Sequence, residues 1–137
     1  MNSPKDTSLA HLPRSGDKLV DWIFKQFVFF LRRETLRIKR KKYVYTEVDL
    51  HRKAVYGLMR GGTPDPHIDI LISAAKSKHQ NRDEETDTLI HELCHIVFWK
   101  TGERYIEQVD KLMKKRLTQE QKNYLKSFIP RHEVKSA

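Results

Sequence analysis

The chain has 137 residues, of which 38% are hydrophobic and 33% charged, and its formal net charge is +9. This length fits a single domain with a modest core, because single cores are commonest at about 100–150 residues. The longest apolar-rich stretch, residues 19–31, contains three polar side chains and falls short of the about 20 residues that cross a bilayer, so we expect no transmembrane helix. A single cysteine and the lack of a secretory-signal pattern favour the cytoplasm.

The N-terminal part is predicted to be a mobile arm followed by a long helix. Residues 1–14 contain two prolines and few apolar side chains. Ser15 offers an N-cap and Asp17 a first-turn acid for a helix that we expect to run to about Lys41. Its apolar side chains have helical spacing, and we assign them to the core rather than to a membrane surface: Leu19, Val20, Ile23, Phe24, Phe27, Phe30 and Leu31.

The excess positive charge is concentrated in residues 32–42, RRETLRIKRKK. Seven cations in this run are candidates for binding nucleic acid or another polyanion: Arg32, Arg33, Arg37, Lys39, Arg40, Lys41 and Lys42. The alternative is a solvated helix end whose cations suit the negative pole of the helix dipole. We favour this alternative, because no aromatic residue that could stack on a base is interleaved in the run.

Three segments after the basic run have the alternating pattern of strands: residues 43–48, 54–59 and 67–73. The sequence GGTPDP between the last two predicts a hairpin connection. Residues 67–73 (HIDILIS) give the clearest pattern. This segment is either an edge strand to which an extended peptide adds through main-chain hydrogen bonds, or an ordinary member of the sheet.

Helices are predicted for the C-terminal half. After a polar loop over residues 74–82, Asp83 could cap a helix that ends at Gly102, and a second helix follows over about residues 104–116. Thr118 opens TQEQ, a capping-box pattern for a last helix that ends before Pro130. We therefore expect one α+β domain over residues 15–130, with a small sheet of about three strands and a tail over residues 131–137.

The stretch TLIHELCHIVFWKTGERYIEQVD, residues 88–110, contains a His-Glu-x-x-His pattern inside a predicted helix. Residues four apart lie on one helix face, so His91 and His95 can bind one zinc ion at about 2.0–2.1 Å. Glu92 would then reach a metal-bound water and act as general base. The alternative is a pair of histidines that merely decorate a helix.

A catalytic zinc site needs a third protein ligand and one position left for water. We choose Glu107, inside the next helix, where a reversal of the chain could bring it over the first. Glu103, which follows Gly102 closely, Asp110 and His132 are the alternatives, as is an ordinary exposed role for Glu107. Asp110, about one turn after Glu107, is a candidate to accept a hydrogen bond from a ligand histidine.

Other side chains have weaker assignments. Three are candidates to stabilise an oxyanion: Tyr105, Tyr124 and His132. Cys94 points away from His95 and is expected to be packed rather than reactive. The remaining histidines lack metal-ligand spacing and are expected on the surface or in loops: His11, His51, His67 and His79.

The run HELCH, followed by apolar residues, a glycine and a helix with a glutamate, resembles the zincin metallopeptidases, and within them the gluzincin-like pattern of two His and one Glu. TLIHELCHIVFWKTG…IEQVDKL looks like small metallopeptidase-like proteins of phages and prophages, and it is similar in outline to the ImmA/IrrE peptidases. The resemblance covers about residues 54–117. It implies a zinc cofactor held by His91, His95 and Glu107, a catalytic Glu92, and a peptide or protein substrate.

The SprT-like proteases, which act on proteins attached to DNA, are a weaker match. Their third ligand is a histidine, and this chain has none between His95 and His132. The predicted function is therefore a zinc metallopeptidase. The alternative is a basic nucleic-acid- or protein-binding protein on a zincin scaffold, with zinc structural or absent.

Overall fold

A computed structural model describes residues 11–48, 51–61 and 67–134, and within them the chain forms four helices and five strands. The expected α+β class is confirmed. The elements in chain order are α1 (Lys18–Leu31), β1 (Leu36–Lys41), β2 (Val44–Val48), β3 (His51–Val55), β4 (Gly57–Gly61), β5 (Ile68–Ser73), α2 (Arg82–Val97), α3 (Glu103–Arg116) and α4 (Gln119–Lys126). Most of the expected N-terminal arm, residues 1–10, and the last three residues of the expected tail lie outside the described residues.

Helix α1 is shorter than expected and begins at a different cap. Asp17, not Ser15, is the N-cap, and its carboxylate accepts from the backbone N–H groups of Leu19 and Val20. The helix ends at Leu31, so the expectation of a helix to Lys41 is wrong: much of the basic run forms β1. The apolar residues beyond Leu31 are Leu36 and Ile38, two positions apart, which is the spacing of a strand rather than a helix.

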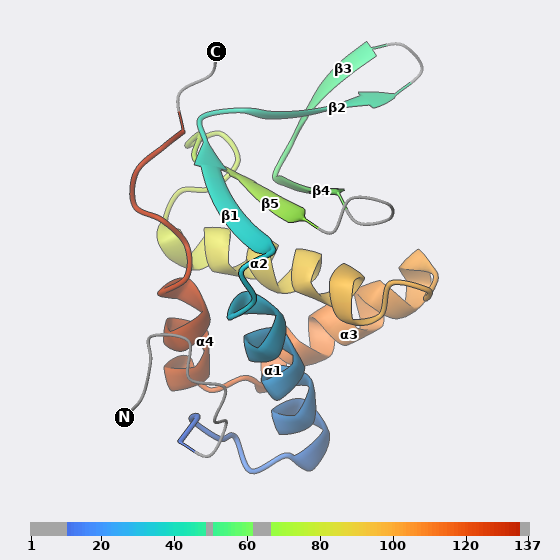
Figure 1. Ribbon diagram of the computed structural model, residues 1–137, viewed down its shortest axis with the longest axis vertical. Coiled ribbons are helices and arrows are strands. Elements are labelled where there is room, and N and C mark those ends of the chain that lie inside the picture. Colours follow the sequence, from blue (N-terminus) through green and yellow to red (C-terminus); the bar gives the residue numbers. More distant parts are fainter. Residues whose placement is uncertain (1–10, 49–50, 62–66, 135–137) are drawn as a thin grey trace.

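The main sheet has three strands in the order β1–β5–β4, as Figure 1 shows. β5 runs parallel to β1 and antiparallel to β4. The predicted hairpin is confirmed by the pairing of Gly61 with Ile68 across β4 and β5, although residues 62–66 are outside the described part. β5 is therefore the central strand, and its expected alternative role as an edge strand is wrong. β2 and β3 form a separate antiparallel pair.

The helices cover one face of the main sheet, and the β2–β3 pair rises on the other side (Figure 1). Helix α2 is the central helix, since it packs against β4 and β5 as well as against the other three helices. Its buried side chains Leu89 and Leu93 belong to the same core cluster as Phe24, Phe27 and Ile70. Because this face of α2 is buried in the core, the face that carries His91 and His95 is the one that remains accessible.

The C-terminal half agrees with the expected order of helices. Thr118 caps α4 with its side chain, and Gln121 completes the predicted capping box by accepting from the Thr118 backbone N–H. Within the described ranges, no helix combines the length and apolar character needed to cross a membrane.

Candidate metal centre

The candidate site depends on where α2 ends and how the chain turns back. Asn81, rather than the expected Asp83, is the N-cap of α2 and accepts from the Glu84 N–H. The helix ends at Val97 instead of Gly102, and the next residues reverse the chain, with Thr101 N–H donating to the carbonyl of Phe98. Gly102 is then the N-cap of α3, so Glu103 is the first residue of a helix that returns toward α2.

His91, His95 and Glu103 form a cluster that could hold a metal ion, because one ligand atom from each lies within 4.8 Å of the others. The Nε2 atoms of the two imidazoles are 3.2 Å apart. The Glu103 carboxylate places Oε1 at 3.6 Å from His91 Nε2 and Oε2 at 3.5 Å from His95 Nε2. Two ligands of a tetrahedral ion bound at about 2.0–2.2 Å lie about 3.3–3.6 Å apart. The two imidazoles and the carboxylate are therefore close enough together for one ion to lie between them, with His91 facing Oε1 and His95 facing Oε2.

Glu107, our choice from the sequence, is exposed on α3 and is not a member of this cluster. The geometry moves the candidate third ligand to Glu103. The physical reason is the early end of α2 at Val97. The turn back is completed by Gly102, and the first turn of α3, rather than its second, lies over the imidazoles.

Asp110 lies where a partner of His91 was expected. Its Oδ2 is 3.5 Å from His91 Nδ1, on the side of the ring opposite to Nε2. The Lys114 ammonium donates to the same oxygen at 2.9 Å, whereas Asp110 Oδ1 is buried and has no hydrogen-bond partner among the described residues. A carboxylate in this position can hold the ring of His91 so that Nε2 faces the other ligands.

The two imidazoles differ in charge preference. The nearby Asp110 carboxylate raises the pKa of His91, while burial lowers the pKa of His95. Burial alone would raise the pKa of Asp110, but contacts with His91 and Lys114 hold it below its usual range. A divalent cation would displace the proton from His91, because only the neutral imidazole binds a metal.

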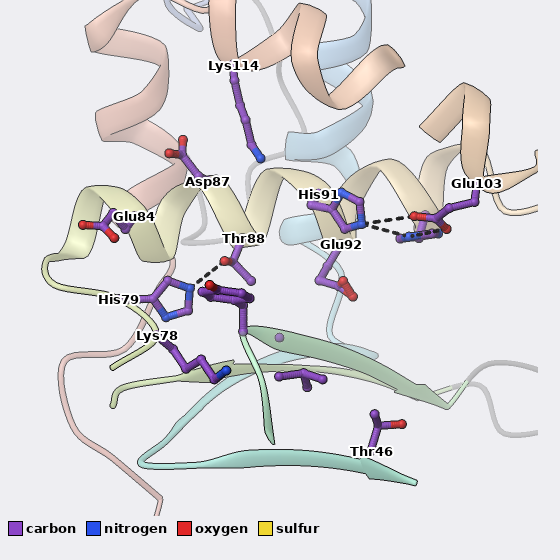
Figure 2. Close-up of a pocket in the computed structure, with 14 residues that line it drawn as sticks. Thr46, Lys78, His79, Glu84, Asp87, Thr88, His91, Glu92, Glu103 and Lys114 are labelled. Carbon is purple, nitrogen blue, oxygen red and sulfur yellow. Dashed lines mark hydrogen bonds and ion pairs between the residues drawn. The ribbon is translucent and has the colours of Figure 1, made fainter. Parts of the chain in front are cut away.

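Glu92 is the buried acid of the site, with 8% of its surface exposed. Burial raises the pKa of its carboxyl. In Figure 2 its side chain lies next to His91 and points from α2 toward the strands. A carboxylate whose proton affinity is raised in this way is suited to accept a proton from a nearby water.

These side chains open into a groove of about 850 Å³ between α2 and the strands. One wall comes from α2 and from Lys114 of α3, and the opposite wall includes Thr46 of β2 and Gly57 of β4. Figure 2 shows that Glu84 and Thr88 continue the α2 wall away from His91. The groove therefore extends well beyond the metal cluster and has room for an extended ligand.

His79 is a groove residue that sequence reasoning missed. It was expected on the surface or in a loop; it is in a loop, but only 4% of it is exposed. Its Nδ1 lies 2.6 Å from the carbonyl of Ser73 and its Nε2 2.6 Å from Thr88 Oγ1. Because a carbonyl only accepts, Nδ1 carries a hydrogen. Thr88 could have been found from its place three residues before His91, but no periodic pattern leads to His79.

The expected oxyanion side chains lie away from the groove. Tyr105 is 63% exposed, and neither Tyr105, Tyr124 nor His132 lines the cavity among the described residues. The Tyr124 hydroxyl accepts from the Arg32 guanidinium, and its ring packs edge-on against Phe24. Cys94 is fully buried, as expected, and burial raises the pKa of its thiol to about 12.

No family model matches the chain, and neither the curated proteins nor the solved structures include a significant match to it.

Proposed function

We propose that the protein is a zinc metallopeptidase of the zincin type, with His91, His95 and Glu103 as metal ligands. The observation that carries this proposal is the closeness of the three side chains: the two imidazole Nε2 atoms are 3.2 Å apart, and each lies 3.5 or 3.6 Å from one oxygen of the Glu103 carboxylate, which is close to the spacing of ligands around zinc. The buried Glu92 beside the cluster and the long groove support it. The likeness of the HELCH motif to zincins points the same way.

The chain's own groups account for binding and proton transfer. A zinc ion held here would lower the pKa of a bound water and polarise the substrate carbonyl. Asp110 orients His91, and Glu92 takes a proton from the water that attacks the carbonyl carbon. As the carbon–nitrogen bond breaks, Glu92 gives that proton to the leaving amine. The products are a carboxylic acid and an amine, so the atoms balance.

The substrate is proposed to bind as an extended peptide along β4. Within the described residues β4 pairs with β5 alone, and Gly57 at its start lines the groove. An extended chain placed beside β4 would form main-chain hydrogen bonds and run between that strand and α2. In this proposal β4, rather than the segment 67–73 suggested by the sequence, is the edge strand to which an extended peptide adds.

The ligand set is tested by measuring the zinc content of purified variants. We expect Glu103→Gln to lose most of its zinc after dialysis, because the neutral amide is a poor ligand, while the wild type retains about one ion per chain. Glu107→Gln is the matched control, with the same chemical change four residues later on α3, and it should retain zinc. Loss of zinc from Glu107→Gln with retention by Glu103→Gln would contradict the assignment.

The catalytic role is tested with Glu92→Gln. This variant should bind zinc normally and lose peptide cleavage by about 100-fold or more, because a general base contributes about 10²–10⁴-fold. Cleavage of an unstructured protein such as casein, followed by mass spectrometry, gives the readout. Full activity in Glu92→Gln would remove Glu92 from the mechanism. A zinc-loaded protein with no cleavage by any form would instead favour a binding protein on this scaffold.

Two further parts of the proposal stay predictions. A cytoplasmic site of action rests on the single cysteine, which is buried. An origin in a phage or prophage rests on the motif likeness alone. The SprT-like alternative is disfavoured by an acid, Glu103, at the third ligand position.

A further inference from the structure

The basic run forms a strand whose two sides differ. In β1 and in its continuation after a bend at residues 42–43, the buried positions are Leu36 and Val44, and the even-numbered Arg40 also turns inward, to Glu85. Within β1 the odd-numbered Arg37, Lys39 and Lys41 lie on the side opposite to Leu36 and Arg40, and the exposed Tyr43 and Tyr45 follow after the bend. Side chains two residues apart on a strand are about 6.6 Å apart, so three cations form a regular row that leads to two tyrosines.

The neighbouring strands add little negative charge to this side. Asp69 of β5 is paired in register with Arg37 of β1 and with Arg60 of β4, and partners in register point to the same side of a sheet. Lys39 donates to Asp69 at 3.2 Å, but both side chains are about one-third exposed and the pair is weak. Among the described residues of these three strands, Asp69 has Arg37, Lys39 and Arg60 as neighbours on this side, and Lys41 adds a further cation along β1, so positive charge predominates.

Two partly exposed tyrosine rings lie next to this charge. Tyr43 is 45% and Tyr45 37% exposed, and their ring centroids are 6.2 Å apart. The ammonium of Lys42 lies 5.7 Å from the centre of the Tyr43 ring. The aromatic residues that stacking on bases requires are absent inside the run, but two of them follow directly after it, and the contact of Lys42 with Tyr43 links them to its charge.

We propose that this outer side of the segment 37–45 binds single-stranded nucleic acid, with phosphates along Arg37, Lys39 and Lys41 and bases stacked on Tyr43 and Tyr45. A row of cations suits a polymer with repeating negative charge, and exposed aromatic rings stack on unpaired bases of any sequence. In a duplex the base faces are stacked on one another and cannot pack on a tyrosine. An acidic protein would be bound by the cations alone, which leaves the two exposed rings without a role. The surface is separate from the metal cluster and does not depend on peptide cleavage.

The test is binding of a fluorescent oligothymidylate of about 15 nucleotides, followed by anisotropy at several salt concentrations. The variant Arg37→Gln/Lys39→Gln/Lys41→Gln should bind at least about tenfold more weakly, and its salt slope should fall by about 2, because each phosphate contact contributes about 0.7. A matched control removes three exposed cations from α3: Lys111→Gln/Lys115→Gln/Arg116→Gln. The control should keep the wild-type slope and affinity within about threefold.

A second pair of variants guards against loss of the fold. Arg37→Gln/Lys41→Gln keeps the Lys39–Asp69 pair and should lower the slope by about 1.4, and Tyr43→Ser should weaken binding about fivefold without changing the slope. Three results would each overturn the proposal. They are no binding by the wild type at low salt, an equal loss in the α3 control, and equal affinity for duplex DNA or polyglutamate with no effect of Tyr43→Ser.

Discussion

Gln121 is a fully buried polar side chain that forms hydrogen bonds with three different parts of the chain. Its Oε1 accepts from the backbone N–H of Thr118 in the capping box of α4. Its Nε2 donates to Asp21 Oδ1 at 2.9 Å and to the carbonyl of Pro13 at 3.1 Å. Asp21 also accepts from the N–H and hydroxyl of Ser15. One amide therefore joins the start of α4 to the start of α1.

This arrangement predicts that Gln121→Glu destabilises the protein by about 2 kcal/mol or more. A glutamate satisfies the capping-box pattern equally well, but it would bring a second carboxylate against Asp21 and would lose both donated hydrogen bonds in a buried place. Urea denaturation at neutral pH measures the change. Asp21→Asn in the same chain should recover part of it. If Gln121→Glu were as stable as the wild type, the hydrogen bond from Gln121 to Asp21 would make no net contribution to the free energy of unfolding.

Asp21 also predicts a dependence of stability on pH. Burial would raise its pKa, but the hydrogen bonds from Ser15, Gln121 and Gly16 hold it below the ordinary value of 3.8. A carboxyl with a lowered folded-state pKa contributes stability above the unfolded-state pKa and loses it as the pH falls through the folded-state value. Wild type should therefore be more stable than Asp21→Asn at pH 6, and the difference should shrink below about pH 3.8. Denaturation curves at pH 6 and pH 3 check this, and a difference that widens in acid would contradict it.

The individual site residues show how far sequence reasoning reaches. His91, Glu92 and His95 lie on one helix, so local periodicity is enough to bring them together. The choice between Glu103 and Glu107 depends instead on how the chain turns between two helices. That turn is set by Phe98, whose N–H continues the α2 bonding pattern while its carbonyl accepts from Thr101. No periodic pattern in the sequence marks this turn.

At the scale of elements, the approach of α2 to β4 rests on Gly57. A Cβ at this position would lie 2.5 Å from Thr88 Cγ2 and 3.1 Å from the carbonyl oxygen of Leu71. Thr88 is hydrogen-bonded to His79 and lies on the groove side of α2, about one helical turn before Glu92. The missing side chain at Gly57 therefore sets the distance between the two walls of the groove.

We expect Gly57→Ala to destabilise the protein by about 1–3 kcal/mol, because overpacking forces the helix and strand apart. Thr88→Ser in the same chain removes the clashing methyl group but keeps the hydroxyl that faces His79, and it should restore part of the loss. Thermal unfolding of the four forms measures this. Gly102→Ala is the control, since no atom lies within 4 Å of a Cβ there. Equal effects at Gly57 and Gly102 would contradict the packing account.

Secondary-structure elements were predicted correctly where a local pattern determines them, and wrongly where tertiary packing overrides the local preference. The capping box at Thr118 and the alternation at Ile68, Ile70 and Ile72 both gave the correct element. The basic run was expected to extend α1 to about Lys41, and lysine and arginine are good helix formers. Pairing of Ile38 with Ile70 in the sheet overrides that preference. The alternation of Leu36 and Ile38 is visible in the sequence. Only the packing of these residues in the sheet shows that it outweighs the helix preference of the cations.

At the scale of the whole molecule, Arg40 connects parts that are distant in sequence. Its guanidinium donates to both oxygens of Glu85 on α2, at 2.7 and 3.0 Å, and to the carbonyl of Arg131. The Glu85 side chain is 3% exposed, whereas the side chains of Lys39, the preceding residue, and of its partner Asp69 are each about one-third exposed. The sheet, the central helix and the C-terminal segment thus meet at one cation.

Arg40→Met should lower the free energy of unfolding by about 3 kcal/mol, because it leaves the Glu85 carboxylate buried without a partner. Lys39→Met, the same change one residue earlier, should cost less than about 1 kcal/mol, since its ion pair is solvated. Guanidinium denaturation of both variants gives the comparison. An Arg40→Met/Glu85→Met double variant should be more stable than Arg40→Met alone. Equal costs for Arg40→Met and Lys39→Met would show that burial of the pair is unimportant.

Strand β2 faces two different surroundings with adjacent residues. Thr46 lines the groove beside the metal cluster, while the ring of Tyr45 lies on the opposite, outward side. Neighbouring side chains on one strand move together, so a displacement of β2 widens or narrows the groove and shifts the tyrosine surface in the same step. A ligand in the groove that displaces β2 would change the affinity of the tyrosine surface for its own ligand. Thermodynamic linkage then requires that a ligand on the tyrosine surface changes the affinity of the groove by the same factor.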